Sequence, residues 1–164
     1  MQGEKFTNTT YTVKAILGLI EAREIAIPEI QRPFVWRATQ VRDLMDSLYK
    51  GYPTGYLILW KNPNVKLKDG TISSGKKVVI DGQQRITALM TAVAGQKVMN
   101  KNFEETRIKI AFNPFAALSK DNDAEIFAVQ TPAHLKSKNW IPDIAEIFKP
   151  EFSSFNFILK YCKD

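Results

Sequence analysis

The spacing of apolar residues along the chain changes from helical to alternating, and these changes predict its secondary structure. The first pattern is a single apolar stripe at helical spacing that follows Thr12, a residue type that caps helices, and fades near Arg23. A second apolar stripe of the same kind follows Thr39 and stops at Gly51. We therefore expect two amphipathic helices, the first capped by Thr12 and the second capped by Thr39.

Between and after these helices the patterns favour extended structure. Residues 25–36 contain two prolines and should follow an extended path. Residues 56–60 are almost all apolar, which predicts a central strand buried on both faces. Residues 107–112 alternate charged and apolar side chains, as a half-buried strand does, and residues 125–129 predict another strand. Towards the end, Pro142 suits the first turn of a helix, and residues 151–164 repeat helically.

The strongest local pattern is a buried strand that runs through a one-step turn into a helix. Residues 78–80 are β-branched, Asp81 and Gly82 follow, and apolar residues then recur at helical spacing from Ile86. The first turn of this helix would carry Gln83, Gln84 and Arg85. Backbone N–H groups at a helix start have no partner within the helix, and a glycine lets a ligand approach the backbone closely. A guanidinium and two amides beside them make a candidate phosphate pocket.

The same residues also have a purely structural interpretation. Asp81 is a good helix cap, and Asp81 and Arg85 can form an ion pair across one helical turn. Upstream, Gln31 and Arg32 interrupt an otherwise apolar extended segment, and they either converge on the pocket of Arg85 or simply face solvent. Spacing alone does not choose between these alternatives.

Composition narrows the classes of protein. At 164 residues and 45% hydrophobic content, the chain suits one α+β domain with a real core. One cysteine, no apolar run long enough for a membrane span and no secretory signal favour the cytoplasm. Because His134 is the only histidine, the chain by itself cannot build a multi-histidine zinc site or an HNH nuclease centre, and we expect no metal site of its own. Residues 70–76 spell the start of a P-loop but lead into a strand, so we reject that motif.

The formal net charge of +6 leaves a second class of function open. A basic protein suits a polyanionic partner such as DNA, and the exposed faces of Trp36 and Trp60 could stack on bases. The alternative to a nucleotide site is therefore a DNA-binding or modification-sensing module without catalysis.

Three segments together resemble the N-terminal domain of GmrSD-type modification-dependent restriction enzymes, long filed as a domain of unknown function. They are Ile27-Pro28-x-x-Gln31-Arg32-Pro33-Phe34-x-Trp36, Leu48-x-x-Gly51-Tyr52-Pro53-x-Gly55 with Leu59-Trp60, and Val79-Ile80-Asp81-Gly82-Gln83-Gln84-Arg85-Ile86-Thr87-x-Leu89. The resemblance implies a ParB/sulfiredoxin-like α+β fold, with a mixed sheet flanked by helices, over residues 1–164. It also implies that an NTP is bound or hydrolysed to regulate defence against modified foreign DNA. In relatives a nuclease module follows this domain, and we expect this chain to be a fragment without it.

From these residues we expect the following site. Gly82, Arg85, Gln31 and Arg32 would bind the phosphates of an NTP, with Mg²⁺. Asp81 would cap the helix or, second, bind the metal or act as a general base, and Gln83 or Gln84 would orient an attacking water. A guanidinium locked in an internal ion pair, with the nearby amides blocked by side chains, would contradict this site.

Overall fold

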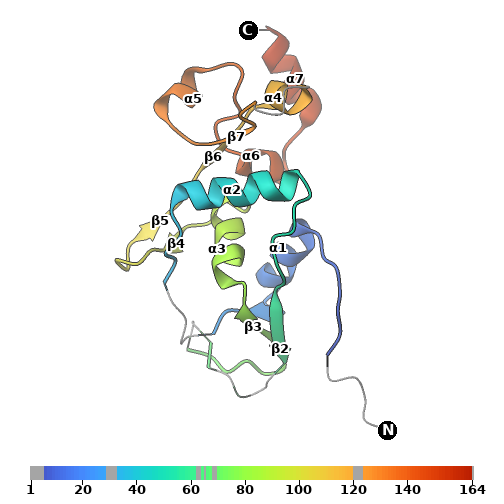
Figure 1. Cartoon of the computed structure of the whole chain (residues 1–164), viewed down its shortest axis with the longest axis vertical. Helices are drawn as coiled ribbons and strands as arrows, with labels where there is room; N and C mark the ends of the chain where they lie inside the picture. The colour runs from blue at the N-terminus through green and yellow to red at the C-terminus, as the bar shows by residue number, and fades with distance from the viewer. Residues whose placement is uncertain are drawn as a thin grey trace.

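The computed structural model describes residues 6–28, 33–61, 64, 66–67, 70–119 and 124–163. Helices and short strands alternate along it, which confirms the predicted α+β class. The likeness to the ParB/sulfiredoxin fold stays a prediction. A three-stranded sheet lies at one end of the molecule, helix α2 crosses its middle, and helices α4 to α7 gather at the other end (Figure 1). Within the described ranges, no helix is both long and apolar enough to cross a bilayer.

The three-stranded sheet is mixed, and its order corrects one prediction. Strand β3 (Lys77–Asp81) lies in the centre, parallel to β1 (Ile25–Ala26) and antiparallel to β2 (Ile58–Lys61). The prediction that residues 56–60 form a central strand buried on both faces was wrong, because β2 is an edge strand and the side chains of Ile58 and Trp60 are about half exposed. The buried central strand is β3.

Helices α1 (Val13–Glu21) and α3 (Gln83–Ala92) pack on one face of this sheet. Their contact is a buried apolar cluster that contains Ile16, Ile86 and the strand residue Val79. The predicted first helix is confirmed, since the Thr12 hydroxyl oxygen accepts a hydrogen bond from the Ala15 N–H at 3.1 Å.

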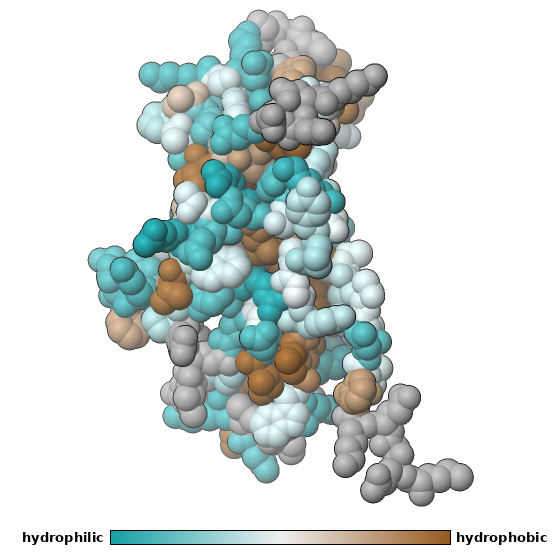
Figure 2. Space-filling model, in the orientation of Figure 1, coloured by the Kyte–Doolittle hydropathy of each residue, from teal (hydrophilic) through white to brown (hydrophobic). Residues whose placement is uncertain are grey.

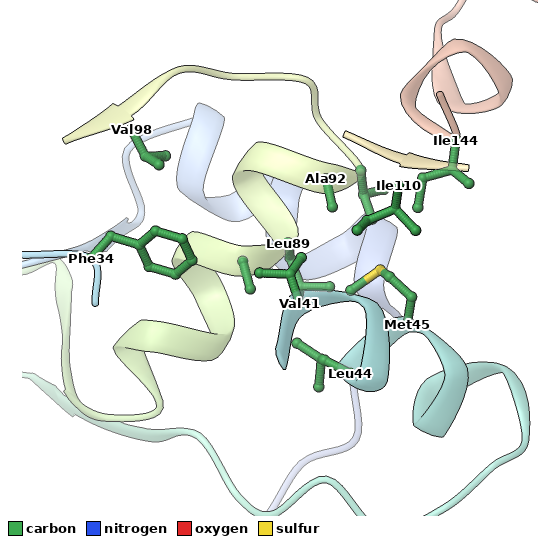
Figure 3. Close-up of a cluster of buried hydrophobic side chains, with 11 residues drawn as sticks. Phe34, Val41, Leu44, Met45, Leu89, Ala92, Val98, Ile110 and Ile144 are labelled. Atoms are coloured by element: carbon green, nitrogen blue, oxygen red, sulfur yellow. The ribbon is translucent and has the colours of Figure 1, made fainter. Parts of the chain in front are cut away.

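Helix α2 (Ala38–Tyr49) forms the larger core with α3. Eleven buried residues meet there, several of them drawn in Figure 3. Thr39 lies inside this helix, so the predicted cap was wrong; the helix begins after Arg37, whose N–H donates to the Gln40 side chain at 2.9 Å. The predicted end is confirmed, because Gly51 follows the last turn with a φ of +70°.

The second half of the chain consists of short elements. The strands form two antiparallel pairs, β4 (Val98–Met99) with β5 (Glu105–Thr106) and β6 (Ile110–Phe112) with β7 (Phe127–Val129). The helices are α4 (Pro114–Leu118), α5 (Pro132–Lys136), α6 (Ala145–Phe148) and α7 (Ser154–Lys163). The strands predicted at residues 107–112 and 125–129 are thus present in shorter form, and the helix near the end of the chain is confirmed.

One local expectation in this half was wrong. Pro142 precedes α6 instead of opening it, because the Asp143 carboxylate accepts the Ala145 N–H at 3.1 Å and starts the helix there. His134, the single histidine, lies in the short helix α5, and its Nδ1 accepts the Thr131 N–H at 3.0 Å.

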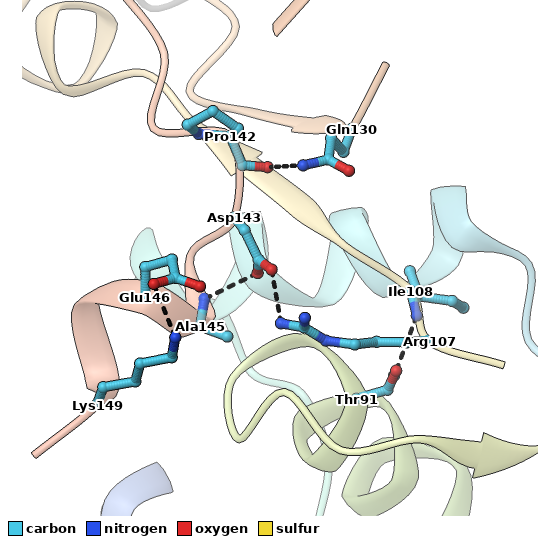
Figure 4. A network of polar contacts seen from close by, with 9 residues as sticks. All are labelled: Thr91, Arg107, Ile108, Gln130, Pro142, Asp143, Ala145, Glu146 and Lys149. Carbon is cyan, nitrogen blue, oxygen red and sulfur yellow. Dashed lines mark hydrogen bonds and ion pairs between the residues drawn. The ribbon is translucent and has the colours of Figure 1, made fainter. Parts of the chain in front are cut away.

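A buried ion pair in the second half of the chain lies beside the end of helix α3 (Figure 4). The Arg107 guanidinium donates to the Asp143 carboxylate at 2.6 Å, and both side chains are mostly shielded from solvent. Beside it, the Thr91 hydroxyl oxygen of α3 accepts the Ile108 N–H at 2.8 Å. This network holds the segment before β6 against the end of α3.

Candidate functional site

The predicted strand–turn–helix is present. Strand β3 ends at Asp81, Gly82 adopts the left-handed conformation with a φ of +93°, and α3 begins at Gln83. The expectation that Asp81 caps the helix was wrong: Gly82 is the N-cap residue, and in the described structure no side chain accepts a hydrogen bond at this helix start. The first N–H groups of α3 thus lack both helical partners and a side-chain cap.

An irregularity in the sheet turns Asp81 towards solvent. Leu59 pairs with Val79, but its neighbour Ile58 pairs with Asp81, so β3 carries one extra residue at Ile80. Such a β-bulge re-aims the side chains next to it. The Asp81 side chain is accordingly 63% exposed. The last residue of a central strand thereby presents its carboxylate at the surface beside the helix start.

Arg85 is held by three acceptors inside the protein. Its guanidinium donates to the Thr54 carbonyl at 2.7 Å, to the Tyr56 carbonyl at 2.8 Å and to the Asp81 carboxylate at 2.9 Å. Its side chain is only 19% exposed. The structural interpretation of Asp81 and Arg85 as an ion pair is thus correct, and the first half of the condition stated against the site is met, because the guanidinium is locked inside the protein. The second half is not met among the described residues, because no side chain caps the first N–H groups of α3.

Two glycines make this arrangement possible. A Cβ atom on Gly55 would lie 2.7 Å from Nη1 of Arg85, and one on Gly82 would lie 2.3 Å from Cδ2 of Leu57. Both glycines have positive φ angles, which side chains with a Cβ rarely adopt. The segment from Thr54 to Leu57 can therefore lie directly against the start of α3.

The side chains of Gln83 and Gln84 also bind within the protein. Gln83 donates to the Val79 carbonyl at 3.2 Å. Gln84 accepts the Val35 N–H at 3.0 Å and donates to the Pro33 carbonyl at 3.2 Å. These bonds attach the start of α3 to its own strand and to the distant segment 33–35.

Gln31 and Arg32, expected to join the site, lie outside the described residues. The contact of Gln84 with Pro33 nevertheless places the residue that directly follows Arg32 at the start of α3. Pro33 and Gln84 are therefore neighbours in space although 51 positions separate them in the sequence, and the convergence of Gln31 and Arg32 on the site stays a prediction.

The turn between β3 and α3 presents both positively and negatively charged groups. The uncapped helix start favours an anion, because its N–H groups and the helix dipole are positive. The Asp81 carboxylate repels an anion but accepts a divalent cation, the usual companion of nucleotide phosphates. Within the described residues, no cluster of three or more histidine, cysteine, aspartate or glutamate side chains could hold a metal by itself.

A comparison with protein families shows to which family this chain belongs. The family model described as the N-terminal domain of the GmrSD restriction endonuclease matches residues 13–160, nearly the whole chain. The chain belongs to this family. The resemblance inferred from the three segments is thus confirmed, and the match includes the turn at Gly82.

A second comparison finds a longer relative of this GmrSD N-terminal domain. An uncharacterized protein of Methanocaldococcus jannaschii, MJ0686, is 27% identical over 115 residues, which is 57% of this chain and 19% of that protein. The chain therefore spans about a fifth of the length of the curated relative that it matches.

Sequence reasoning missed three parts of the site in this GmrSD domain. They are the carbonyls of Thr54 and Tyr56, the close approach of Gly55, and the β-bulge at Ile80. The available signal was Gly55 itself, because a glycine permits a close approach of another group to the backbone. Backbone carbonyls and strand register leave no residue-type signature, so the sequence could not reveal the other two.

Proposed function

We propose that this domain binds a nucleoside triphosphate with Mg²⁺ at the turn between β3 and α3, as the regulatory part of a protein that restricts foreign DNA. The observation that carries the proposal is the uncapped start of α3, reached through a left-handed glycine and bordered by Arg85 and an exposed carboxylate. Membership in the GmrSD N-terminal family supports the setting in restriction.

In this proposal the terminal phosphates lie on the N–H groups that follow Gly82. Asp81 holds Mg²⁺, which removes the repulsion between its carboxylate and the phosphates. Arg85 already lies at Asp81, with three of the five N–H donors of its guanidinium directed to acceptors of the protein. It keeps the segment around Gly55 in place and lends positive charge to the site.

Binding has better support than hydrolysis. A glutamine that orients an attacking water needs a free group on its amide. Gln84 uses its amide oxygen for the Val35 N–H and its amide nitrogen for the Pro33 carbonyl, whereas Gln83 makes one hydrogen bond among the described residues, from its nitrogen to the Val79 carbonyl. Hydrolysis would therefore depend on the side-chain oxygen of Gln83. Release of inorganic phosphate in the presence of Mg²⁺ tests this step directly.

The first test is calorimetric titration of a panel of nucleoside triphosphates, with and without Mg²⁺, into wild type and Arg85→Ala. We expect Mg²⁺-dependent binding to wild type and at least about tenfold weaker binding to the variant, because it loses both a positive charge beside the phosphates and the three hydrogen bonds that hold the segment around Gly55; tenfold corresponds to about 1.4 kcal/mol. Arg85→Lys keeps the charge but cannot span three acceptors, so it separates charge from geometry.

Arg42→Ala is the matched control, because Arg42 also lies beside an aspartate, Asp43, but on helix α2. Circular dichroism should report folded protein for all variants. No nucleotide binding to wild type would remove the proposal, and so would equal affinities of Arg85→Ala and Arg42→Ala.

A DNA-binding module remains a second candidate, on one specific observation. Lys61 and Lys77 lie directly opposite each other at the end of the sheet, next to the half-exposed Trp60. Facing like charges destabilise a sheet, so an anionic partner would relieve them. Trp36 is partly buried and packs against the larger core, so Trp60 is the more exposed of the two tryptophans considered for such a surface. A steep loss of oligonucleotide affinity with added salt, without any nucleotide binding, would favour this candidate.

A further inference from the structure

A ridge of exposed apolar side chains borders the proposed phosphate site. Tyr56, Ile58 and Trp60 occupy alternate positions leading into and along β2, and Ile80 lies on β3; they are 77%, 53%, 50% and 51% exposed, respectively. Ile58 and Trp60 are alternate residues of β2 and therefore point to the same face, whereas Tyr56 precedes the strand. Figure 2 shows brown, apolar surface over the part of the molecule that contains this sheet. We call these four residues the β2 ridge.

The backbone of the β2 ridge is fixed to the site itself. One nitrogen of Arg85, Nη2, donates both to the Tyr56 carbonyl at 2.8 Å and to the Asp81 carboxylate at 2.9 Å. Ile58 is the strand partner of Asp81. The exposed ring of Tyr56 thus extends from a backbone that is held next to the carboxylate expected to bind Mg²⁺.

Such an arrangement has a cost that a ligand would offset. Burying an aromatic or branched apolar side chain lowers the free energy, yet these four side chains remain exposed to water although their backbone is ordered. A flat ring such as tyrosine is a good stacking surface for any nucleobase, because each base has a π-face. The ridge therefore provides an apolar, aromatic neighbour to a polar site for phosphates.

We propose that the base of the bound nucleotide stacks on Tyr56, with Ile58 and Ile80 completing the apolar contact. This inference rests on the proposed function and deepens it: the nucleoside triphosphate is recognised by its base as well as by its phosphates, so inorganic triphosphate should bind less tightly. Stacking is tolerant of base identity, so the β2 ridge gives affinity for nucleotides without a strong preference among the four bases.

The test compares the affinities of a nucleoside triphosphate and of inorganic triphosphate, both with Mg²⁺, for wild type and three variants. Wild type should bind the nucleotide about ten- to a hundredfold more tightly than inorganic triphosphate. Tyr56→Ala should remove most of that difference, whereas Tyr56→Phe, which keeps the ring, should retain it. Tyr52→Ala is the control, because Tyr52 is also exposed, at 60%, but its N–H is held by Ser47 of α2.

The outcomes separate this inference from the proposed function. If inorganic triphosphate and the nucleotide bind wild type equally, and Tyr56→Ala changes neither affinity, the phosphate site stands and the stacking inference is overturned. If neither ligand binds, the proposed function itself fails. If Tyr56→Ala alters only self-association in sedimentation experiments, the β2 ridge is an interface between protein chains and stacking is likewise overturned.

Discussion

At the scale of single residues, Gly82 is the position on which the site depends. Its φ of +93° lies in the left-handed region, and a Cβ there would approach Leu57 to 2.3 Å. Gly51 has a similar φ of +70° but open space where its Cβ would lie. A substitution at either glycine would strain the backbone because of the positive φ. Only at Gly82 would the new side chain also clash with a neighbour.

We predict that Gly82→Ala lowers the free energy of unfolding by about 2–4 kcal/mol, the sum of a left-handed alanine and an overpacked contact. Gly51→Ala should lower it by only about 1–2 kcal/mol, since it introduces the strain alone. Denaturant titrations of both variants measure the difference. Equal losses would mean that Leu57 moves aside freely and that the close approach at Gly82 has no energetic consequence.

Residue type alone predicted the role of some residues at helix ends correctly and that of others wrongly. Thr12 and Gly51 act at helix ends as their chemistry indicates. Asp81 did not, because the extra residue at Ile80 displaces it from the cap position and a nearby guanidinium competes for its carboxylate. The guanidinium belongs to Arg85, which was part of the predicted motif. Two of its three acceptors are backbone carbonyls, however, and no sequence pattern indicates them.

At the scale of elements, hydrophobic spacing gave the helices more reliably than the strands. In a helix such as α2 or α3, apolar residues repeat over several turns and so indicate the buried face. Strand β2 has only four residues, too few for such a repeat. Its apolar content suggested burial on both faces, but the sheet ends at β2 and leaves the outward side chains of Ile58 and Trp60 half exposed. The excess apolar surface of β2 is what identifies the ridge as a candidate binding surface.

Helix α1 offers a test of stability at this scale. Gly18 lies at an exposed position inside the helix, its φ is not positive, and a Cβ there would meet no atom within 4 Å. Gly18→Ala should therefore raise the free energy of unfolding by about 0.5–1 kcal/mol, because alanine loses less backbone entropy in a helix. Ala15→Gly, at another exposed position of α1, is the reciprocal control and should lower it by a similar amount. A loss of stability in Gly18→Ala would contradict the open space at that face.

At the scale of the whole molecule, long-range polar contacts join segments that the sequence presents as unrelated. Gln84 reaches Pro33, 51 positions away, and Arg107 reaches Asp143, 36 positions away. Neither pairing can be derived from local spacing, because both depend on how the sheet and the short strands of the second half are placed. The Arg107–Asp143 pair matters most here, since it joins the segment before β6 to the segment before α6, next to the residue, Ile108, whose N–H binds Thr91 of α3.

This pair is buried, and its surroundings leave little room for an unpaired charge. Only 9% of the Asp143 side chain and 25% of the Arg107 side chain are exposed, and a Cβ on Gly95 would already lie 3.0 Å from the guanidinium. Nε of Arg107 is buried without a partner among the described residues. Removing the carboxylate would leave a shielded cation with even fewer acceptors, which is the costly way to break an ion pair.

We predict that Asp143→Ala lowers the free energy of unfolding by about 3 kcal/mol, from the lost pair together with the lost start of α6. Glu146→Ala is the matched control, because it breaks the nearby pair with Lys149, whose two side chains are about half exposed, and should cost less than about 1 kcal/mol. The double variant Arg107→Met with Asp143→Ala removes the stranded cation and should recover part of the loss. If Asp143→Ala behaves like Glu146→Ala, water reaches the guanidinium and the ion pair does not hold the segments before β6 and α6 together.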